Sequence, residues 1–161
     1  MILVPQVVSL RVNGAAVEME VDDRLLLSDF LRDMCSLKSV HVGCDLGSCG
    51  ACTVDIDGQI ELSCLSLTAQ YTGRSITTLE GLAASIDVQL LQRKLGEHHG
   101  LQCGFCTPGV IVAAIEMARF RGPLSREEIR AKLNGNLCRC TGYFNIINAI
   151  EDWLNERRND L

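Results

Sequence analysis

The N-terminal half of the chain carries the alternation of apolar and polar side chains that is typical of half-buried β-strands. In residues 17–21, apolar side chains alternate with acidic ones. Residues 7–12 are expected to pair with them, because Asn13-Gly14 between the two segments is a strong signal for a tight hairpin turn. The chain is therefore predicted to begin with a β-hairpin.

A predicted helix and a second hairpin follow. Residues 25–34 place their apolar side chains on roughly one face, the spacing of a helix that packs on a sheet. Asp57-Gly58 separates two apolar segments within residues 54–62, which predicts a second hairpin. Residues 75–79 are expected to form the last strand. We expect these strands to wrap round the one helix and form a small α+β unit.

The pattern changes after Gly81, where the periodicity becomes that of helices. Val88, Leu91 and Leu95 are spaced at i, i+3 and i+7, and Asp87 is the expected N-cap of their helix.

Three more helices are predicted in this half. Thr107 and Pro108 fit the N-cap and the first helical position of a helix that is apolar nearly all round and extends to residue 120. Ser125 and Glu128 form a capping box for the next helix. A last helix begins at about residue 142. Four helices and no strand indicate a compact helical bundle.

Length and composition fit two small domains. The chain has 161 residues, which we divide into residues 1–81 and 82–161. Its net charge of −5, without a basic tract, disfavours nucleic acid as a partner. Hydrophobic residues make up 47% of a chain with no apolar run of membrane-spanning length. This composition indicates apolar surface that a partner covers.

The N-terminus and the cysteine content bear on compartment and metal. Residues 1–10 lack a basic segment and Pro5 breaks their apolar run, so no signal peptide is readable. We expect a cytoplasmic protein, or a periplasmic one exported on the signal of a partner. Nine cysteines without a secretory signal favour metal over disulfides. Cys35 is left over from the groups below and is expected to be an ordinary buried thiol.

The most specific motif is a group of four cysteines, which are Cys44, Cys49, Cys52 and Cys64. The first three have the C-x4-C-x2-C spacing of plant-type [2Fe–2S] proteins, and the fourth comes from a neighbouring segment. Three glycines interleave with them, and without a Cβ atom they let backbone amides approach the sulfurs. These are Gly43, Gly47 and Gly50. A zinc knuckle or free core thiols are the alternatives.

A second group of four cysteines lies in the helical half and consists of Cys103, Cys106, Cys138 and Cys140. They form a C-x2-C pair and a C-x-C pair, each immediately before a predicted helix start. Free amides and partial positive charge at helix N-termini would stabilise thiolates and an anionic cluster. Taken alone, this group fits a four-cysteine zinc site as well. The presence of a first full group favours a second [2Fe–2S] cluster, which leaves His98 and His99 as a solvated helix end.

Three segments around the cysteines form a recognisable pattern, which reads G-C-D-L-G-S-C-G-A-C-T-V (43–54), H-G-L-Q-C-G-F-C-T-P-G (99–109) and G-N-L-C-R-C-T-G-Y (135–143). They resemble the small iron–sulfur subunit of the molybdenum hydroxylases. That family includes xanthine dehydrogenase, aldehyde oxidoreductase, aerobic carbon monoxide dehydrogenase and the bacterial N-heterocycle dehydrogenases.

The resemblance implies a plant-type ferredoxin-like (β-grasp) domain with one [2Fe–2S] cluster on the first four cysteines. An all-α four-helix domain with a second cluster on the other four would follow it. It implies that Gln102 hydrogen-bonds a molybdenum–pterin cofactor and that Cys140 lies against the amino group of that cofactor. The implied partners are a large molybdenum-binding subunit and a medium FAD-binding subunit, in a heterotrimer or a dimer of heterotrimers.

The sequence offers no substrate or nucleotide site of its own. It has no G-x-G-x-x-G after a strand, no P-loop and no G-x-S-x-G. We therefore expect an oxidoreductase subunit that relays electrons from the molybdenum–pterin site through two clusters to a flavin or another acceptor. The alternatives are a free-standing two-cluster carrier and an interaction module built on zinc.

Overall fold

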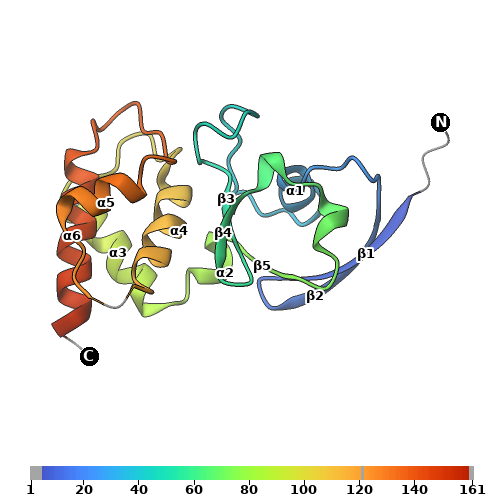
Figure 1. Cartoon of the computed structure of the whole chain (residues 1–161), viewed down its shortest axis with the longest axis horizontal. Helices are drawn as coiled ribbons and strands as arrows, with labels where there is room; N and C mark the ends of the chain where they lie inside the picture. Colours follow the sequence, from blue (N-terminus) through green and yellow to red (C-terminus); the bar gives the residue numbers. More distant parts are fainter. Residues whose placement is uncertain (1–4, 121, 160–161) are drawn as a thin grey trace.

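The N-terminal half of the chain folds around a five-stranded sheet in the order β2-β1-β5-β3-β4 (Figure 1). The computed structural model describes residues 5–120 and 122–159. β1 is parallel to β5, and the other neighbouring strands are antiparallel. The strands are β1 (Gln6–Val12), β2 (Ala15–Val21), β3 (Thr53–Ile56), β4 (Gln59–Leu62) and β5 (Ser75–Thr77).

Both predicted hairpins are present. Asn13 and Gly14 have φ angles of 51° and 83°, and Asp57 and Gly58 have φ angles of 50° and 90°. Two successive residues with positive φ are what a tight turn of type I′ requires, and Asn-Gly and Asp-Gly supply it at low cost. Alternate residues of β1 are buried, so β1 has one buried face. This agrees with its predicted pairing to β2, in which apolar and acidic side chains alternate.

The helix expected over residues 25–34 is wrong in its details. The α-helix α1 covers only Leu27–Asp29, and the chain continues as a π-helical turn, η1 (Phe30–Met34). The buried face is nevertheless the predicted one, because Leu27, Phe30 and Leu31 are fully buried. So few residues of apolar periodicity do not distinguish α-helical from π-helical hydrogen bonding. Cys35, which follows, is half-buried instead of buried.

After β5 the described chain consists of helices joined by loops, and no strand is present in residues 78–120 and 122–159. Their core contains the fully buried Trp153 of α6 and Leu91 of α3. The residues of α4 from Val110 to Ala114 are all buried, as its apolar sequence predicts. The helices are α2 (Leu79–Leu82), α3 (Ile86–Glu97), α4 (Thr107–Met117), α5 (Arg126–Lys132) and α6 (Phe144–Asn159).

Two of the predicted helix starts are displaced. Ser85, and not Asp87, precedes α3, and the Asp87 carboxylate instead accepts a hydrogen bond of 2.9 Å from Arg157 of α6. Cys106 is the N-cap of α4, so Thr107 is its first residue. The predicted capping box of Ser125 at α5 is confirmed.

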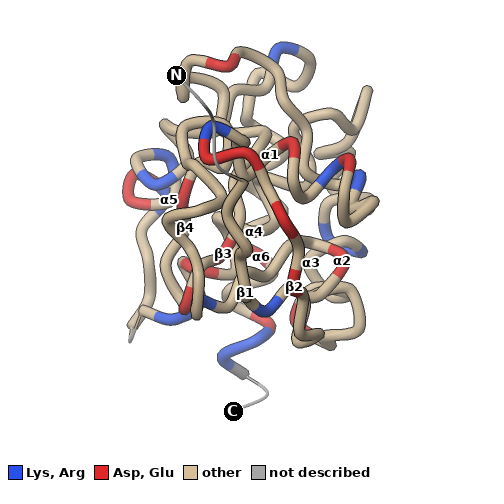
Figure 2. The backbone as a smooth tube through the Cα atoms, turned by 90° about the vertical axis from the view of Figure 1, so that its right-hand side faces the viewer, with Lys and Arg blue, Asp and Glu red and all other residues tan. Residues whose placement is uncertain are grey.

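The molecule has two hydrophobic cores, one under the sheet and one among the helices. We call the two parts the sheet lobe (residues 6–77) and the helical lobe (residues 86–159), and they lie end to end in Figure 1. The predicted boundary between residues 81 and 82 falls in the short helix α2 and remains a prediction. Acidic and basic positions are mixed along the described backbone (Figure 2). Within that part of the chain, every helix is too short or too polar to cross a membrane.

The lobes touch where α4 packs against β3 and β4. Gly109, in the first turn of α4, faces the carbonyl of Gly50. A Cβ atom at position 109 would lie 2.2 Å from that oxygen. A glycine is therefore required at this point, because the two backbones could not otherwise approach so closely.

We expect Gly109→Ala to destabilise the protein by about 1–3 kcal/mol, because the new methyl group forces α4 away from the Gly50 carbonyl. The matched control is Gly96→Ala in α3, where an added Cβ meets nothing within 4 Å. That substitution should stabilise the helix by about 0.5–1 kcal/mol. Denaturant unfolding followed by circular dichroism measures both. Equal stability of the two variants would contradict the close contact.

Candidate metal centres

The first group of cysteines lies on the loop between η1 and β3 and on the turn that follows β4. Cys49 and Cys52 are buried and Cys44 is half-buried at the loop surface. Cys64, the fourth, is buried in the 3-10 turn η2 (Ser63–Leu65). The β3–β4 hairpin returns the chain to the loop, which is how a residue twelve positions after Cys52 joins it.

Backbone amides point at the Cys44 sulfur. The Leu46 and Ser48 amides donate to Cys44 Sγ at 3.4 and 3.3 Å. The loop turns tightly enough for this because Gly47 and Gly50 take positive φ angles of 72° and 67°. This confirms the expectation for two of the three glycines. The third, Gly43, does not take a positive φ.

The four thiols lie close enough to affect one another's ionisation. Besides the Ser48 hydroxyl and the nearby amides, Cys49 helps to lower the pKa of Cys44, and besides burial, Cys52 helps to raise the pKa of Cys64. Two irons bridged by sulfide need four thiolates, so two pairs side by side are a donor set that fits such a cluster. Among the described residues, no three His, Cys, Asp or Glu side chains are grouped as they would be around a single ion.

The second group has the same paired arrangement. Cys103 and Cys140 have their sulfurs 3.5 Å apart, and besides burial, the neighbouring Cys138 thiol helps to raise the pKa of Cys106. Each pair thus takes one cysteine from the C-x2-C motif and one from the C-x-C motif. The first motif ends at the N-terminus of α4, as predicted. The second lies four residues before α6, farther from its helix than expected.

Neighbouring groups hold the second loop in shape. The Cys138 amide donates to the Tyr143 hydroxyl at 2.8 Å, and Cys138 Sγ lies 3.1 Å from the Thr141 hydroxyl. A hydrogen bond from the Phe105 amide lowers the pKa of Cys103. Such contacts orient the sulfurs and favour their ionised form.

The thiols within each group differ in pKa. The hydroxyl of Ser48 and the nearby amides lower the pKa of Cys44 to about 6. Burial raises the pKa of Cys64 to about 11 and that of Cys106 to about 12. In the protein without metal, Cys44 therefore ionises before Cys64, and Cys103 ionises before Cys106. Loading the inner positions with metal must release protons.

The two groups adjoin each other. The Leu137 amide, next to Cys138, donates to the Cys49 carbonyl at 2.7 Å. The side chain of the buried Asn136 donates to the Gly50 carbonyl at 3.1 Å. A cavity of about 220 Å³ lies at this junction, lined by Cys49 and by all four cysteines of the second group.

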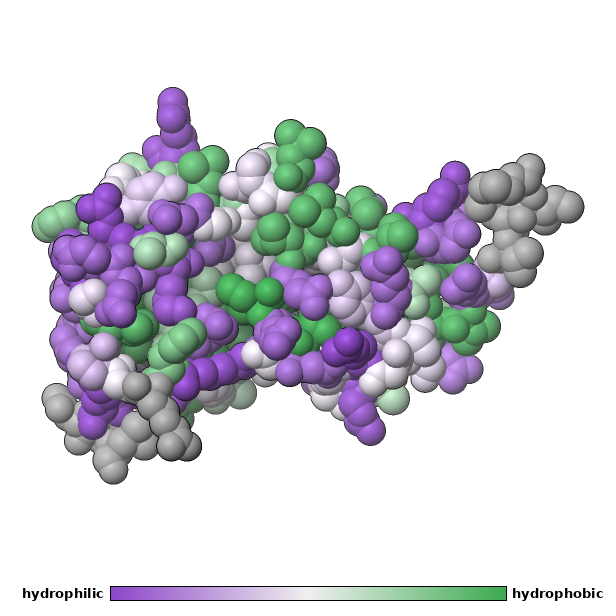
Figure 3. All heavy atoms as spheres, viewed as in Figure 1, coloured by the Kyte–Doolittle hydropathy of each residue, from purple (hydrophilic) through white to green (hydrophobic). Residues whose placement is uncertain are grey.

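The outer face of the second group is exposed to solvent. Gln102, Cys103 and Cys140 are all exposed, so a group outside this chain could reach them. Large apolar side chains surround both cysteine groups. Leu46 is 79% exposed and Leu65 59% beside the first group, and apolar atoms gather over the middle of the face in Figure 3. Leu101, Phe105 and Leu137 are exposed beside the second.

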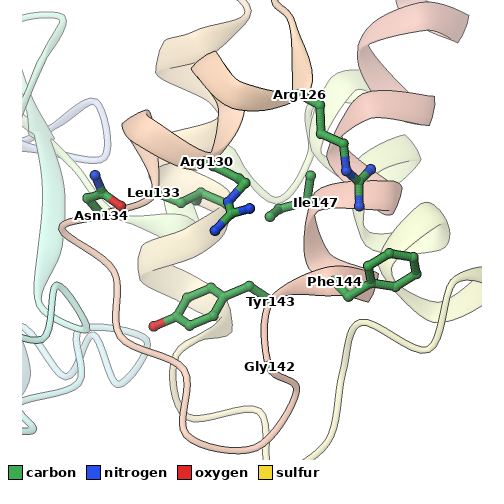
Figure 4. Close-up of a pocket in the computed structure, with 8 residues that line it drawn as sticks. All are labelled: Arg126, Arg130, Leu133, Asn134, Gly142, Tyr143, Phe144 and Ile147. Carbon is green, nitrogen blue, oxygen red and sulfur yellow. The ribbon is translucent and has the colours of Figure 1, made fainter.

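A pocket of about 480 Å³ lies between α5 and α6 (Figure 4). Tyr143 and Phe144 extend to opposite ends of it, below Arg126 and Arg130. Arg126 lies over the Phe144 ring and pairs with Glu151. The described residues that line this pocket include two arginines and a tyrosine, and no cysteine, histidine or carboxylate among them.

Comparison with known proteins identifies the two halves. Residues 10–74 match the 2Fe-2S iron-sulfur cluster binding domain family, and residues 78–151 match the [2Fe-2S] binding domain family. The chain is 52% identical over 148 residues to the caffeine dehydrogenase subunit gamma of Pseudomonas sp. (strain CBB1). That match covers 90% of this chain and 89% of the relative. The chain belongs to the small iron–sulfur subunits of the molybdenum hydroxylases.

Other relatives agree with this family. The iron–sulfur subunit is 43% identical over 145 residues to the nicotine 6-hydroxylase small subunit of Paenarthrobacter nicotinovorans, covering 90% of this chain and 87% of the relative. The quinoline 2-oxidoreductase structure from Pseudomonas putida 86 contains a chain with a TM-score of 0.89 and 41% identity. That match covers 98% of this chain and 99% of the other.

These findings confirm the predicted fold, a ferredoxin-like domain followed by an all-α [2Fe–2S] domain, and the presence of two [2Fe–2S] clusters. The iron–sulfur subunit serves electron transfer in an oxidoreductase with partner subunits. Sequence reasoning missed the residues that join the two cysteine groups, because Leu137 and Asn136 carry no chemical signature. His41 was missed for the same reason. Its ring stacks on Phe105, and its Nδ1 donates to the Phe105 carbonyl at 2.8 Å.

We expect Cys103→Ser to remove the second cluster and leave the first in place, because the two groups share no sulfur. Iron and acid-labile sulfide should each fall by about half. The control is Cys35→Ser, which changes a thiol outside both groups and should leave the content unchanged. Retention of the full content in Cys103→Ser would show that Cys103 is not a ligand.

Proposed function

We propose that this subunit carries electrons one at a time from a molybdenum–pterin cofactor on a large partner subunit to a flavin on a medium subunit, or to another acceptor. In this proposal Cys103, Cys106, Cys138 and Cys140 hold the cluster that receives electrons. Cys44, Cys49, Cys52 and Cys64 hold the cluster that passes them on. The clusters supply reversible one-electron redox chemistry, and the protein sets their spacing, burial and surroundings.

The observation that supports this relay best is the hydrogen bond between the two loops. A path from Cys138 to Cys49 crosses the Leu137 backbone and one N–H···O contact of 2.7 Å. Electron tunnelling weakens with distance and with gaps through space. A short hydrogen bond between residues that adjoin the ligands keeps the gap small, so the arrangement suits transfer between two centres.

The entry side of the relay is the exposed face around Gln102. The amide of Gln102 is free to hydrogen-bond a cofactor bound to the partner, and Cys140 beside it brings a ligand sulfur to the same surface. The exposed side chains of Leu101 and Leu137 give the partner apolar area to bury. We assign the large molybdenum-binding subunit to this face.

The exit side is the loop around Cys44. Leu46 and Leu65 are exposed beside it, and amides donate to the Cys44 sulfur. These hydrogen bonds favour the more negative, reduced form of the cluster and so raise its potential. We assign the flavin-binding or other acceptor subunit to this face, in a heterotrimer or a dimer of heterotrimers. The cytoplasmic location expected from the sequence belongs to the same proposal.

Low-temperature EPR of the dithionite-reduced protein tests the proposal. We expect two distinct [2Fe–2S] signals, because the two groups differ in exposure and in hydrogen bonding. On native gel filtration, the protein should elute together with larger chains. A single signal, or a lone 17.6 kDa species in the native extract, would contradict it.

Gln102→Ala tests the entry face. We expect both cluster signals to remain, while the molybdenum EPR signal of the complex shifts and turnover falls by about tenfold or more, as the loss of one positioning hydrogen bond would cause. Gln92→Ala, at an exposed position on α3, is the control and should change none of these. Wild-type molybdenum signals and activity in Gln102→Ala would remove its proposed role.

A further inference from the structure

The helix α4 and the strand β3 leave the two cysteine groups side by side. β3 begins directly after Cys52, and α4 begins directly after Cys106. They pack against each other and extend away from the clusters in the same sense (Figure 1). Whatever joins their far ends therefore controls the angle between the two lobes.

Arg119, just beyond the end of α4, makes that far joint. Its guanidinium donates to the carboxylate of Asp55 in β3 and to the carbonyl of Gly58 in the β3–β4 turn. The Asp55 side chain is only 11% exposed, so the ion pair is partly removed from water. The other oxygen of the Asp55 carboxylate accepts a hydrogen bond of 2.8 Å from the Gly58 amide. This hydrogen bond orients the carboxylate toward Arg119.

A guanidinium that binds two acceptors of one hairpin fixes the orientation of α4 relative to that hairpin as well as the distance between them. The near joint consists of the Leu137 and Asn136 contacts with the cluster loop and of the His41 ring on Phe105. The segment at α2 is also held to the sheet lobe, because Thr78 and Glu80 are hydrogen-bonded to Asn13 and Ser39. Arg119 adds a contact at the far end of α4, where a tilt of the lobes about the near joint would otherwise be least restrained. The 11 residues of α4 make a lever about 16 Å long, so a small tilt becomes a displacement at the cluster end.

We propose that Arg119 is a positioning residue for electron transfer. Its contacts with Asp55 and Gly58 hold the two lobes at a fixed angle, and this angle keeps the two clusters at a fixed separation. This rests on the proposed function, because it takes both cysteine groups to hold clusters. Arg119 contacts neither group and takes no part in the redox chemistry itself. It acts through α4 and β3 alone.

The test measures the magnetic coupling between the two clusters in the reduced holoprotein. Arg119→Gln should broaden or abolish the splitting that each cluster causes in the EPR signal of the other, because the separation is no longer single-valued. Iron, sulfide and the g-values of each cluster should stay as in the wild type. Arg119→Lys, which keeps the charge but not the two-pronged contact, should restore part of the splitting.

The matched control is Arg74→Gln. Arg74 pairs with Asp57 of the same turn at 2.9 Å but lies within the sheet lobe, so its loss should leave the coupling unchanged. Asp55→Asn serves if Arg119→Gln does not fold, because the amide oxygen can keep the Gly58 contact while the ion pair is lost. It should broaden the splitting in the same way.

Wild-type coupling in Arg119→Gln, or in Asp55→Asn where that variant stands in, would overturn the positioning role. Equal loss of coupling in Arg74→Gln would also overturn it, because the effect would then not depend on the joint between lobes. Failure of the proposed function looks different: the wild-type protein itself would lack two cluster signals.

Discussion

The contact between the Leu137 amide and the Cys49 carbonyl is the backbone link between the two cysteine groups. It joins a residue beside one cysteine group to a member of the other, so the distance between the groups is set by backbone geometry. Glycines make this possible on both sides. A Cβ atom at Gly50 would lie 2.1 Å from the Gly135 carbonyl, and Gly109 is equally confined. The two lobes have separate cores and meet at this junction and along the packing of α4 against β3 and β4.

The cysteines differ in their exposure to solvent. Cys103 and Cys140 lie at one surface and Cys44 at another, while Cys49, Cys52 and Cys138 lie between them. In the proposed relay, electrons would enter at the surface of the second group, leave at the surface of the first, and cross a region that is shielded from water between them. Shielding matters because a buried cluster is tuned by fixed amides instead of by mobile solvent. The exposed apolar side chains beside both faces are the surface that partner subunits would cover.

The sequence was sufficient for the fold and for much of the site. Hairpin turns at Asn13-Gly14 and Asp57-Gly58, and the capping box at Ser125, follow from local chemistry and are present. The eight cysteines lie on the loops and turns where the motifs place them, and their division into two ligand sets stays a prediction. The π-helical turn after α1 was not predictable from periodicity. The Asp87 cap was wrong because that carboxylate is taken by Arg157, a residue seventy positions away.

What the sequence could not give is the joining of the lobes. Arg119 belongs to no motif, and Asn136 and Leu137 lie in the 135–143 segment without being metal ligands. The partners of all three lie more than sixty positions away in the chain. Such contacts depend on how two finished domains meet, and apolar periodicity reports only on each domain by itself. The glycines carried a partial signal. Their interleaving with cysteines marked a tight loop, without showing which backbone would approach it.

The most direct test of the central claim is a stepwise reductive titration of the purified protein, with iron and zinc measured on the same sample. Two clusters in series predict that each chain takes up two electrons in separate one-electron steps, with the visible absorption bleaching at each. A protein that contains zinc in place of iron, or that accepts one electron or none, would contradict it.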